Sequence, residues 1–230
     1  MSVHLESVAF DAAAPARLAA FWAGVLAREA RPDARGVLLP GTDTQVGVRF
    51  VPSTSPRVGV NRMHLHLTST DESDFAGTVA KALGLGASHL DVGQLPEEGH
   101  VVLADPEGNE FCVIDPGNSF LAGCGLLGEV ACDGTRQIGL FWAEVLGWPL
   151  VWDENEETAI QAPAGGTKVA WGGPPLAPRF GRNRQHVELV ASHDLTGEIA
   201  RLLAAGATLL GRADAFVELA DPDGNAFRLG

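Results

Sequence analysis

Two histidines, His64 and His66, have a spacing that would let their side chains work together. They lie in the segment Met63-His64-Leu65-His66-Leu67-Thr68, in which apolar and polar residues alternate. This alternation predicts a strand with one face in a core and the other at water or a cavity. Because residues two apart on a strand point to the same face, both imidazoles should share the polar face. On a concave surface such a pair could act as general acid and general base near pH 7, so His64 and His66 are the candidate catalytic residues.

The same spacing recurs with His186 and Glu188 in the second half of the chain. An imidazole would again lie beside a second group that can carry a proton. A structural alternative stays open for both pairs, because His64 and His186 could simply hydrogen-bond across a sheet. All four residues are candidates for ligand binding.

Other kinds of site are not indicated. The sequence has no GxSxG, no Walker loop and no GxGxxG after a strand, and Gly165-Gly166-Thr167-Lys168 predicts a hairpin turn. The three cysteines, Cys112, Cys124 and Cys132, have no CxxC spacing, which argues against a disulfide framework and a zinc knuckle. Cys112 falls in a predicted strand, where a cysteine is most often a small buried apolar residue.

Three tryptophans, Trp148, Trp152 and Trp171, fall close together in the second half. Core packing is the commonest use of such residues, and we expect it for Trp22. Flat, rigid side chains also suit the walls of a pocket for an aromatic or polycyclic ligand. Trp171 is therefore a further candidate for ligand binding, and Arg228 beside it could meet an anionic group.

The segments that must position these residues occur twice. The segment Ala104-Asp105-Pro106-Glu107-Gly108-Asn109 returns as Ala220-Asp221-Pro222-Asp223-Gly224-Asn225, and each copy separates two apolar runs. Asp, Pro, Gly and Asn in this order predict a tight turn between two strands. Two further pairs keep the same order, Phe21-Trp22 with Phe141-Trp142 and Asn61-Arg62-x-His64 with Asn183-Arg184-x-His186. This repetition indicates a duplication, with one domain at 1–118 and a second at 119–230.

Periodicity and turn residues predict the same order of elements in both halves. In the first half we expect helices at 16–26 and 71–85 and strands at 3–10, 36–39, 45–51, 61–68, 88–91, 100–103 and 111–114. In the second half we expect helices at 135–147 and 195–205 and strands at 128–132, 149–152, 158–161, 168–171, 183–189, 216–219 and 227–229.

The composition gives no indication of a nucleic-acid or membrane partner. The net charge of −13 divides evenly, with −7 in residues 1–118 and −6 in residues 119–230. No basic arm or stripe is present, so nucleic acid is not an expected partner. No apolar run approaches the roughly 20 residues that span a bilayer, and the first residues do not form a signal peptide. We therefore expect a cytoplasmic protein without a membrane partner.

Two of these patterns resemble a known superfamily. They are the helix Phe141-Trp142-Ala143-Glu144-Val145-Leu146-Gly147 and the NRxHxxL strand combined with the DPxGNxF hairpin. Together they resemble the vicinal-oxygen-chelate superfamily, in particular its glyoxalase-like and bleomycin-resistance-like branch. The resemblance covers almost the whole chain. It implies an α+β fold of tandem domains, each built of two βαβββ modules with curled mixed sheets around a pocket.

Enzymes of that superfamily bind one divalent metal through His, Gln or Glu, so the resemblance also implies positions for its ligands. His64 and His186 match the histidine that opens the second module of each domain. Where the family has its terminal Glu, this sequence has Cys112 and Arg228. The two remaining ligand positions fall near Ser7 and near Leu127 or Gly128 on the first strands, and near Arg49 and Trp171 on the last strands of the first modules.

One histidine per domain is too few for a divalent site, which needs about three protein ligands. We therefore predict no metal and no cofactor, while His64, His66 and Cys112 could form a soft site in the first domain. The predicted function is metal-free binding of a small organic molecule in one or both pockets. The alternative is a lyase or isomerase with a non-standard metal or an acid–base pair at His64 and His66. The chain would be a monomer with pseudo-dimeric halves or a homodimer, and the sequence leaves open whether it is an enzyme.

Overall fold

The computed structural model describes residues 3–230 except 96, 179 and 182. The helices are α1 (Pro15–Leu26), α2 (Glu72–Leu85), α3 (Arg136–Leu146) and α4 (Leu195–Ala204). The strands of the first half are β1 (Val3–Ala12), β2 (Arg31–Asp33), β3 (Gly36–Leu39), β4 (Gly47–Pro52), β5 (Met63–Leu67), β6 (Ser88–His89), β7 (His100–Ala104) and β8 (Glu110–Ile114). Those of the second half are β9 (Leu127–Cys132), β10 (Leu150–Glu154), β11 (Glu157–Gln161), β12 (Lys168–Trp171), β13 (Gln185–Ala191), β14 (Thr208–Arg212), β15 (Val217–Ala220) and β16 (Ala226–Leu229).

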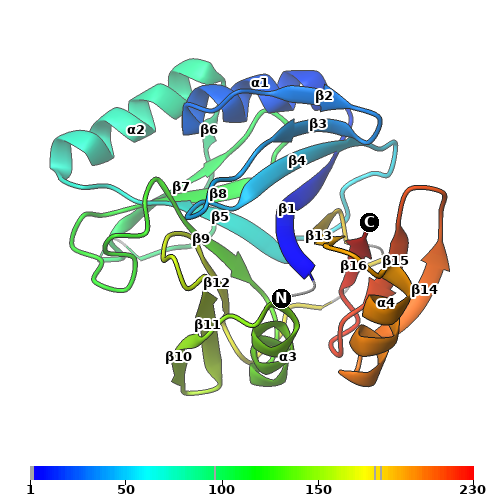
Figure 1. Cartoon of the computed structure of the whole chain (residues 1–230). Coiled ribbons are helices and arrows are strands. Elements are labelled where there is room, and N and C mark those ends of the chain that lie inside the picture. Colours follow the sequence, from blue (N-terminus) through cyan, green and yellow to red (C-terminus); the bar gives the residue numbers. More distant parts are fainter. Residues whose placement is uncertain (1–2, 96, 179, 182) are drawn as a thin grey trace.

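These elements form four successive βαβββ modules, as the repeat predicts. The strands of the modules assemble into two mixed sheets of eight strands (Figure 1). Sheet 1 has the order β14-β15-β16-β13-β1-β4-β3-β2, and sheet 2 has the order β10-β11-β12-β9-β5-β8-β7-β6. The expected α+β architecture of tandem βαβββ modules is confirmed.

The pairing of the modules differs in one respect from what the resemblance implies. The two modules of one half do not share a sheet. Sheet 1 combines the first module with the fourth through the antiparallel pair β1 and β13, and sheet 2 combines the second with the third through β5 and β9. Each sheet is therefore completed only by residues from both halves, and any pocket on a sheet is built from both.

Aromatic residues fix the helices to the sheets in the same way in each half. Trp22 of α1 is buried and lies 5.0 Å, ring to ring, from Phe111 of β8, while Trp142 of α3 lies 5.1 Å from Phe227 of β16. Each contact joins two modules of the same half, although their strands belong to different sheets. The expectation that Trp22 belongs to the core is confirmed.

The helices of each half are also joined by one cation. Lys81 of α2 donates a hydrogen bond to the carbonyl of Val25 at the end of α1, with N···O at 3.2 Å. Arg201 of α4 donates to the carbonyl of Val145 in α3 at 3.1 Å. Because the last carbonyls of a helix lack partners within it, a cation there satisfies one of them. Figure 1 shows α1 and α2 side by side at the top of the molecule.

The repeated turn has a larger role than the hairpin that the sequence predicts. In the first copy, the Asp105 carboxylate accepts hydrogen bonds from the backbone of Glu107 and Asn109 and from the indole of Trp22 at 3.1 Å. The Glu107 carboxylate accepts from the backbone of Ala13 and Ala14, just before α1 begins. The turn therefore links β7 and β8 to the start of a helix in the neighbouring module.

The second copy of the turn repeats these contacts. The Trp142 indole donates to the Asp221 carboxylate at 3.4 Å, and the Asp223 carboxylate accepts from Thr135, the residue before α3. Gly108 and Gly224 have φ values of 81° and 77°, in the left-handed region that glycine adopts without steric cost. The conserved geometry of both copies therefore follows from residues that the repeat shares.

Two strands, β2 and β14, were not expected from the sequence. The residues of β2 are Arg31, Pro32 and Asp33, all exposed, and β14 holds the exposed Leu209 and Leu210. Both are at the ends of sheet 1. An edge strand needs neither the alternation of buried residues nor a full set of backbone donors, so even proline is tolerated there. Among the described residues, no helix combines the length and hydrophobicity that crossing a membrane requires.

Candidate functional site

Each sheet brings four side chains into neighbouring positions on its central strands. In sheet 2 the strand register places Cys112 beside His66, His66 beside Glu129, and Glu129 beside Lys168. In sheet 1 the corresponding residues are Arg228, Glu188, Ser7 and, two residues further along its strand, Arg49. The two sets differ in chemistry, so each sheet is described by itself.

In sheet 2, His66 and Glu129 form a close pair across β5 and β9. The His66 Nδ1 atom lies 2.5 Å from a carboxylate oxygen of Glu129. Burial by itself would lower the pKa of His66, but hydrogen bonds to Cys112 and Glu129 and the charge of Glu129 outweigh it and raise the pKa to about 9. The contact with Glu129 therefore favours the protonated form of His66.

His64 lies next to this pair, and its surroundings act in the opposite direction. Its ring centroid is 4.7 Å from that of His66. Burial, together with the nearby His66 and His100, lowers the pKa of His64 to about 3. The polar face of β5 thus presents a neutral imidazole beside a charged one.

A cavity of about 440 Å³ opens over these residues. Its polar lining includes His64, His66 and Glu129, and its apolar lining includes Phe120, Trp152 and Trp171. The rings of Phe120 and Trp152 meet edge to face, with centroids 5.9 Å apart and planes at 79°. A cavity of this size, with mostly apolar walls and a few polar groups, is typical of small-molecule sites.

The fit of a metal to sheet 2 can be judged from its donor atoms. One nitrogen of His64, one nitrogen of His66 and the sulfur of Cys112 all lie within 4.8 Å of one another. Imidazole and thiolate ligands suit zinc and similar soft divalent ions. His64, His66 and Cys112 could therefore hold such an ion, as the sequence suggests for this part of the chain.

In sheet 1 an ion-pair network fills the corresponding position. Arg49 is fully buried, and its guanidinium lies 2.6 Å from Glu188, 2.5 Å from Asp33 and 3.3 Å from Glu6. The Ser7 hydroxyl donates to the same oxygen of Glu188 at 3.0 Å. A permanently charged guanidinium at the centre of this face does not fit a divalent cation.

Arg228 is a further permanent cation of sheet 1, on β16. Its guanidinium carbon lies 4.2 Å from the ring centroid of Phe216, and its Nε atom lies 3.7 Å from Glu218. His186 is buried with 2% of its surface exposed, and burial lowers its pKa. Sheet 1 therefore carries a buried charged network where sheet 2 carries a cavity.

The structure brings only part of the expected site together. His64, His66 and Trp171 line the cavity, and Cys112 lies beside the two histidines. His186, Glu188 and Arg228 lie in sheet 1, whereas Trp171 lies in sheet 2. The cause is the crossed pairing of the modules, which places the strands of the third and fourth modules in different sheets.

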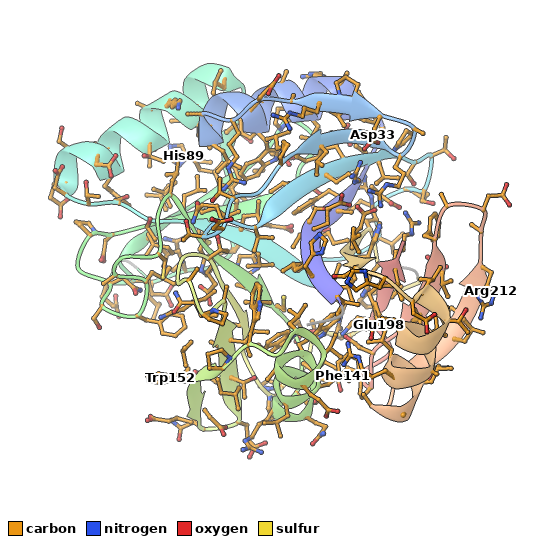
Figure 2. The ribbon with its side chains drawn as sticks, viewed as in Figure 1. Asp33, His89, Phe141, Trp152, Glu198 and Arg212 are labelled. Atoms are coloured by element: carbon orange, nitrogen blue, oxygen red, sulfur yellow. The ribbon has the colours of Figure 1, made fainter. Side chains whose placement is uncertain are left out.

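Sequence reasoning missed Glu129, and it named Trp152 only as a member of the tryptophan cluster from which Trp171 was chosen. Glu129 is 7% exposed and stands between Gly128 and Val130 in the middle of a predicted strand. A carboxylate buried at such a position needs a partner, and this was the signal in the sequence. Figure 2 labels Trp152, beside the cavity, and Asp33, in the ion-pair network, on opposite sides of the view.

The network of sheet 1 predicts a specific loss of stability in acid. Burial would raise the pKa of Glu188, but the contacts with His186, Arg49 and Arg35 outweigh it and lower the pKa to about 2 from an ordinary value of 4.5. Because the folded-state pKa is depressed, the stabilisation is complete above about pH 4.5 and is lost as the pH falls toward 2. Its size is about 3 kcal/mol.

This prediction can be checked by urea unfolding at intervals from about pH 5 to about pH 2.5. The free energy of unfolding should fall over this range in the wild-type chain, and less steeply in a Glu188→Gln variant. Equal slopes in the two proteins would mean that Glu188 does not contribute to the acid sensitivity.

Comparison with known proteins assigns the chain to a family. Residues 7–114 and 129–230 each match the family model described as glyoxalase-like domain. Glyoxalase I from Zea mays superposes with a TM-score of 0.67 at 13% identity, covering 99% of this chain and 92% of that chain. A putative dioxygenase from Bacillus subtilis subsp. subtilis str. 168 superposes with a TM-score of 0.63 at 14% identity, covering 99% of this chain and 84% of that chain.

A shorter similarity is to a glyoxalase/bleomycin resistance protein/dioxygenase family enzyme from Burkholderia phytofirmans PsJN, at 18% identity and a TM-score of 0.39 over 48% of this chain and 96% of that chain. No curated protein matches the chain significantly. The two full-length superpositions establish the fold, and the family model covers most of the sequence. The chain therefore belongs to the glyoxalase-like family of the vicinal-oxygen-chelate superfamily, with two copies of the family's domain in tandem.

Proposed function

We propose that the chain binds a small organic molecule in the cavity of sheet 2, and that it does so without a metal. The observation that carries this proposal is the cavity of about 440 Å³ over His64 and His66, with Trp152 and Trp171 in its lining. In sheet 1, Arg49 and its carboxylate partners fill the corresponding position. One working pocket per chain is thus proposed, although the family's domain occurs twice.

The contacts of His66 support binding without a metal. Glu129 already pairs with His66 at 2.5 Å. A divalent ion held by His64, His66 and Cys112 would act as a Lewis acid, but it would first have to displace the protons of His66 and Cys112. His66 already has Glu129 as its partner and does not need an ion.

A second candidate function is acid–base catalysis by His64 and His66. The specific observation is that the two rings are 4.7 Å apart in one cavity and that their surroundings shift their pKa values in opposite directions. Titratable neighbours whose environments separate their pKa values are a common basis for acid and base roles. This function would use the same pocket and would make the bound molecule a substrate.

Metal analysis and a ligand screen on the full-length chain test the proposal. We expect the purified protein to contain far less than one equivalent of divalent metal, and its melting temperature to rise with members of a panel of phenols, organic acids and amines. Treatment with EDTA should leave these increases unchanged, because a ligand that binds the native state stabilises it by mass action. A stoichiometric ion whose removal abolishes the increases would overturn the metal-free proposal.

A further inference from the structure

We propose that the ligand of this cavity is a flat aromatic molecule that donates a hydrogen bond, such as a phenol, to His64. This inference rests on the proposed function and specifies its ligand class. Two features of the lining support it. One is the shape of the apolar walls, and the other is whether each polar group already has a partner within the protein.

The apolar walls form one large aromatic surface and one surface of small residues. Trp152 leaves 38% of its surface exposed, although it is among the largest side chains of the protein. Alanines 131 and 170, on the adjacent central strands β9 and β12, line the same cavity. Small side chains on a sheet leave a shallow, even surface, and an indole adds a rigid plane. Such a space suits a planar ring system better than a branched or saturated one.

The aromatic wall is held in place by contacts with neighbouring side chains of the protein. Phe120 meets Trp152 edge to face, and the ammonium group of Lys168 lies 4.0 Å from the centroid of the Phe120 ring. The same ammonium group donates a hydrogen bond to the carbonyl of Phe120. A wall that is already ordered costs a ligand little conformational entropy when it binds.

Most charged groups of the lining are already paired. Glu129 contacts His66 at 2.5 Å. Arg62 contacts Asp133 at 2.8 Å and also donates to the carbonyl of Ala177 at 2.8 Å. Lys168 is engaged with Phe120, so these cations are not available to an anionic ligand. The remaining acid of the lining, Glu157, is exposed and further disfavours an anion.

His64 is the imidazole that remains for a ligand. Within the described part of the chain, its ring nitrogens make no hydrogen bond, while its neighbour His66 is held by Glu129. A neutral imidazole has one nitrogen that accepts a hydrogen bond and one that donates. In its neutral form, His64 therefore offers the cavity an acceptor nitrogen that has no partner among the described residues. A hydroxyl group on an aromatic ring would supply the missing donor.

Four probes separate the parts of this inference in calorimetric titrations of the full-length chain. They are 2-naphthol, 2-methoxynaphthalene, which lacks the donor, decahydro-2-naphthol, which lacks the flat ring, and 2-naphthoate, which is anionic. We expect 2-naphthol to bind most tightly and each of the other three to bind at least about tenfold more weakly. Equal affinity for 2-methoxynaphthalene or for decahydro-2-naphthol would overturn the inference.

A variant locates the hydrogen bond. His64→Phe keeps a flat ring but removes the acceptor, so it should reduce the affinity for 2-naphthol about tenfold and leave that for 2-methoxynaphthalene unchanged. Equal loss for both probes would contradict the role of His64. The four probes decide the ligand class on the unaltered protein even if this variant folds poorly.

The outcomes also distinguish this inference from the proposed function. If neither the naphthalene probes nor the phenols of the panel bind, but its organic acids or amines do so in this cavity, the aromatic ligand class is wrong and the proposed function stands. If no compound of the panel binds, both are wrong.

Discussion

Replacing Arg49 by methionine is expected to lower the free energy of unfolding by about 3–5 kcal/mol. The guanidinium is fully buried and lies between Glu188, Asp33 and Glu6. Methionine has a similar apolar stem but leaves the Glu188 carboxylate, whose side chain is 1% exposed, without its closest cation. A buried charge that loses its partner keeps the cost of desolvation and no longer gains the attraction that offset it. Urea unfolding at pH 7 measures the change.

Arg31→Met is the matched control, because it removes another arginine of sheet 1. Arg31 pairs with Glu29 at 3.0 Å, but the two side chains are 63% and 71% exposed. We expect a change of about 0–1 kcal/mol for this exposed pair. The double variant Arg49→Met/Glu188→Leu should recover part of the loss, since it removes the stranded charge as well. If Arg49→Met costs no more than Arg31→Met, the ion-pair network does not stabilise sheet 1.

Replacing Ala170 by tryptophan is expected to abolish ligand binding while the protein stays folded. Ala170 lies on β12, on the cavity side of sheet 2, and an indole there would take up much of the space of about 440 Å³. A ligand that must compete with this side chain should lose at least about 100-fold in affinity, equivalent to about 2.7 kcal/mol. Calorimetric titration measures the affinity, and circular dichroism with thermal unfolding shows whether the fold is retained.

Gly172→Ala provides the control at the rim of the same cavity. A methyl group at this position would meet no heavy atom within 4 Å, so the change should be tolerated and the affinity should stay within about twofold. Undiminished binding in a folded Ala170→Trp protein would show that the ligand site lies elsewhere.

Much of the fold could be predicted from the sequence because the information was local. Alternation around His64 and His66, the apolar face of the helix at Phe21 and Trp22, and the turn at Asp105 each depend on neighbouring residues. The repeat then fixed the order of the modules. The observed strand β5 and helix α1 follow these patterns to within two residues.

The pairing of the modules could not be predicted in this way. The same sequence landmarks occur in both halves. The sequence pattern therefore allows β1 to pair either with β5 or with β13, which is the repeat of β5 in the second half. The choice of β13 for β1 and of β9 for β5 depends on contacts between distant segments. This choice decides that Glu129, and not a residue of the first half, stands beside His66.

The contrast between the two sheets was only partly visible in the sequence. In the sequence, Arg49 and Arg228 stand at implied ligand positions in separate predicted domains, where arginine is not a usual ligand. In the structure they share sheet 1, and Arg49 gains Glu188 from the other half as its partner. A buried arginine needs such carboxylates, and only the fold shows which ones it has.

The stoichiometry of ligand binding tests the central claim most directly, namely that the tandem chain has one working pocket, on sheet 2, and needs no metal there. The measurement is a calorimetric titration of EDTA-treated, full-length protein with the tightest-binding compound of the panel, repeated on the Ala170→Trp variant. We expect one molecule bound per chain in the wild type and none in the variant. Two molecules per chain, or binding that appears only when a divalent ion is restored, would contradict it.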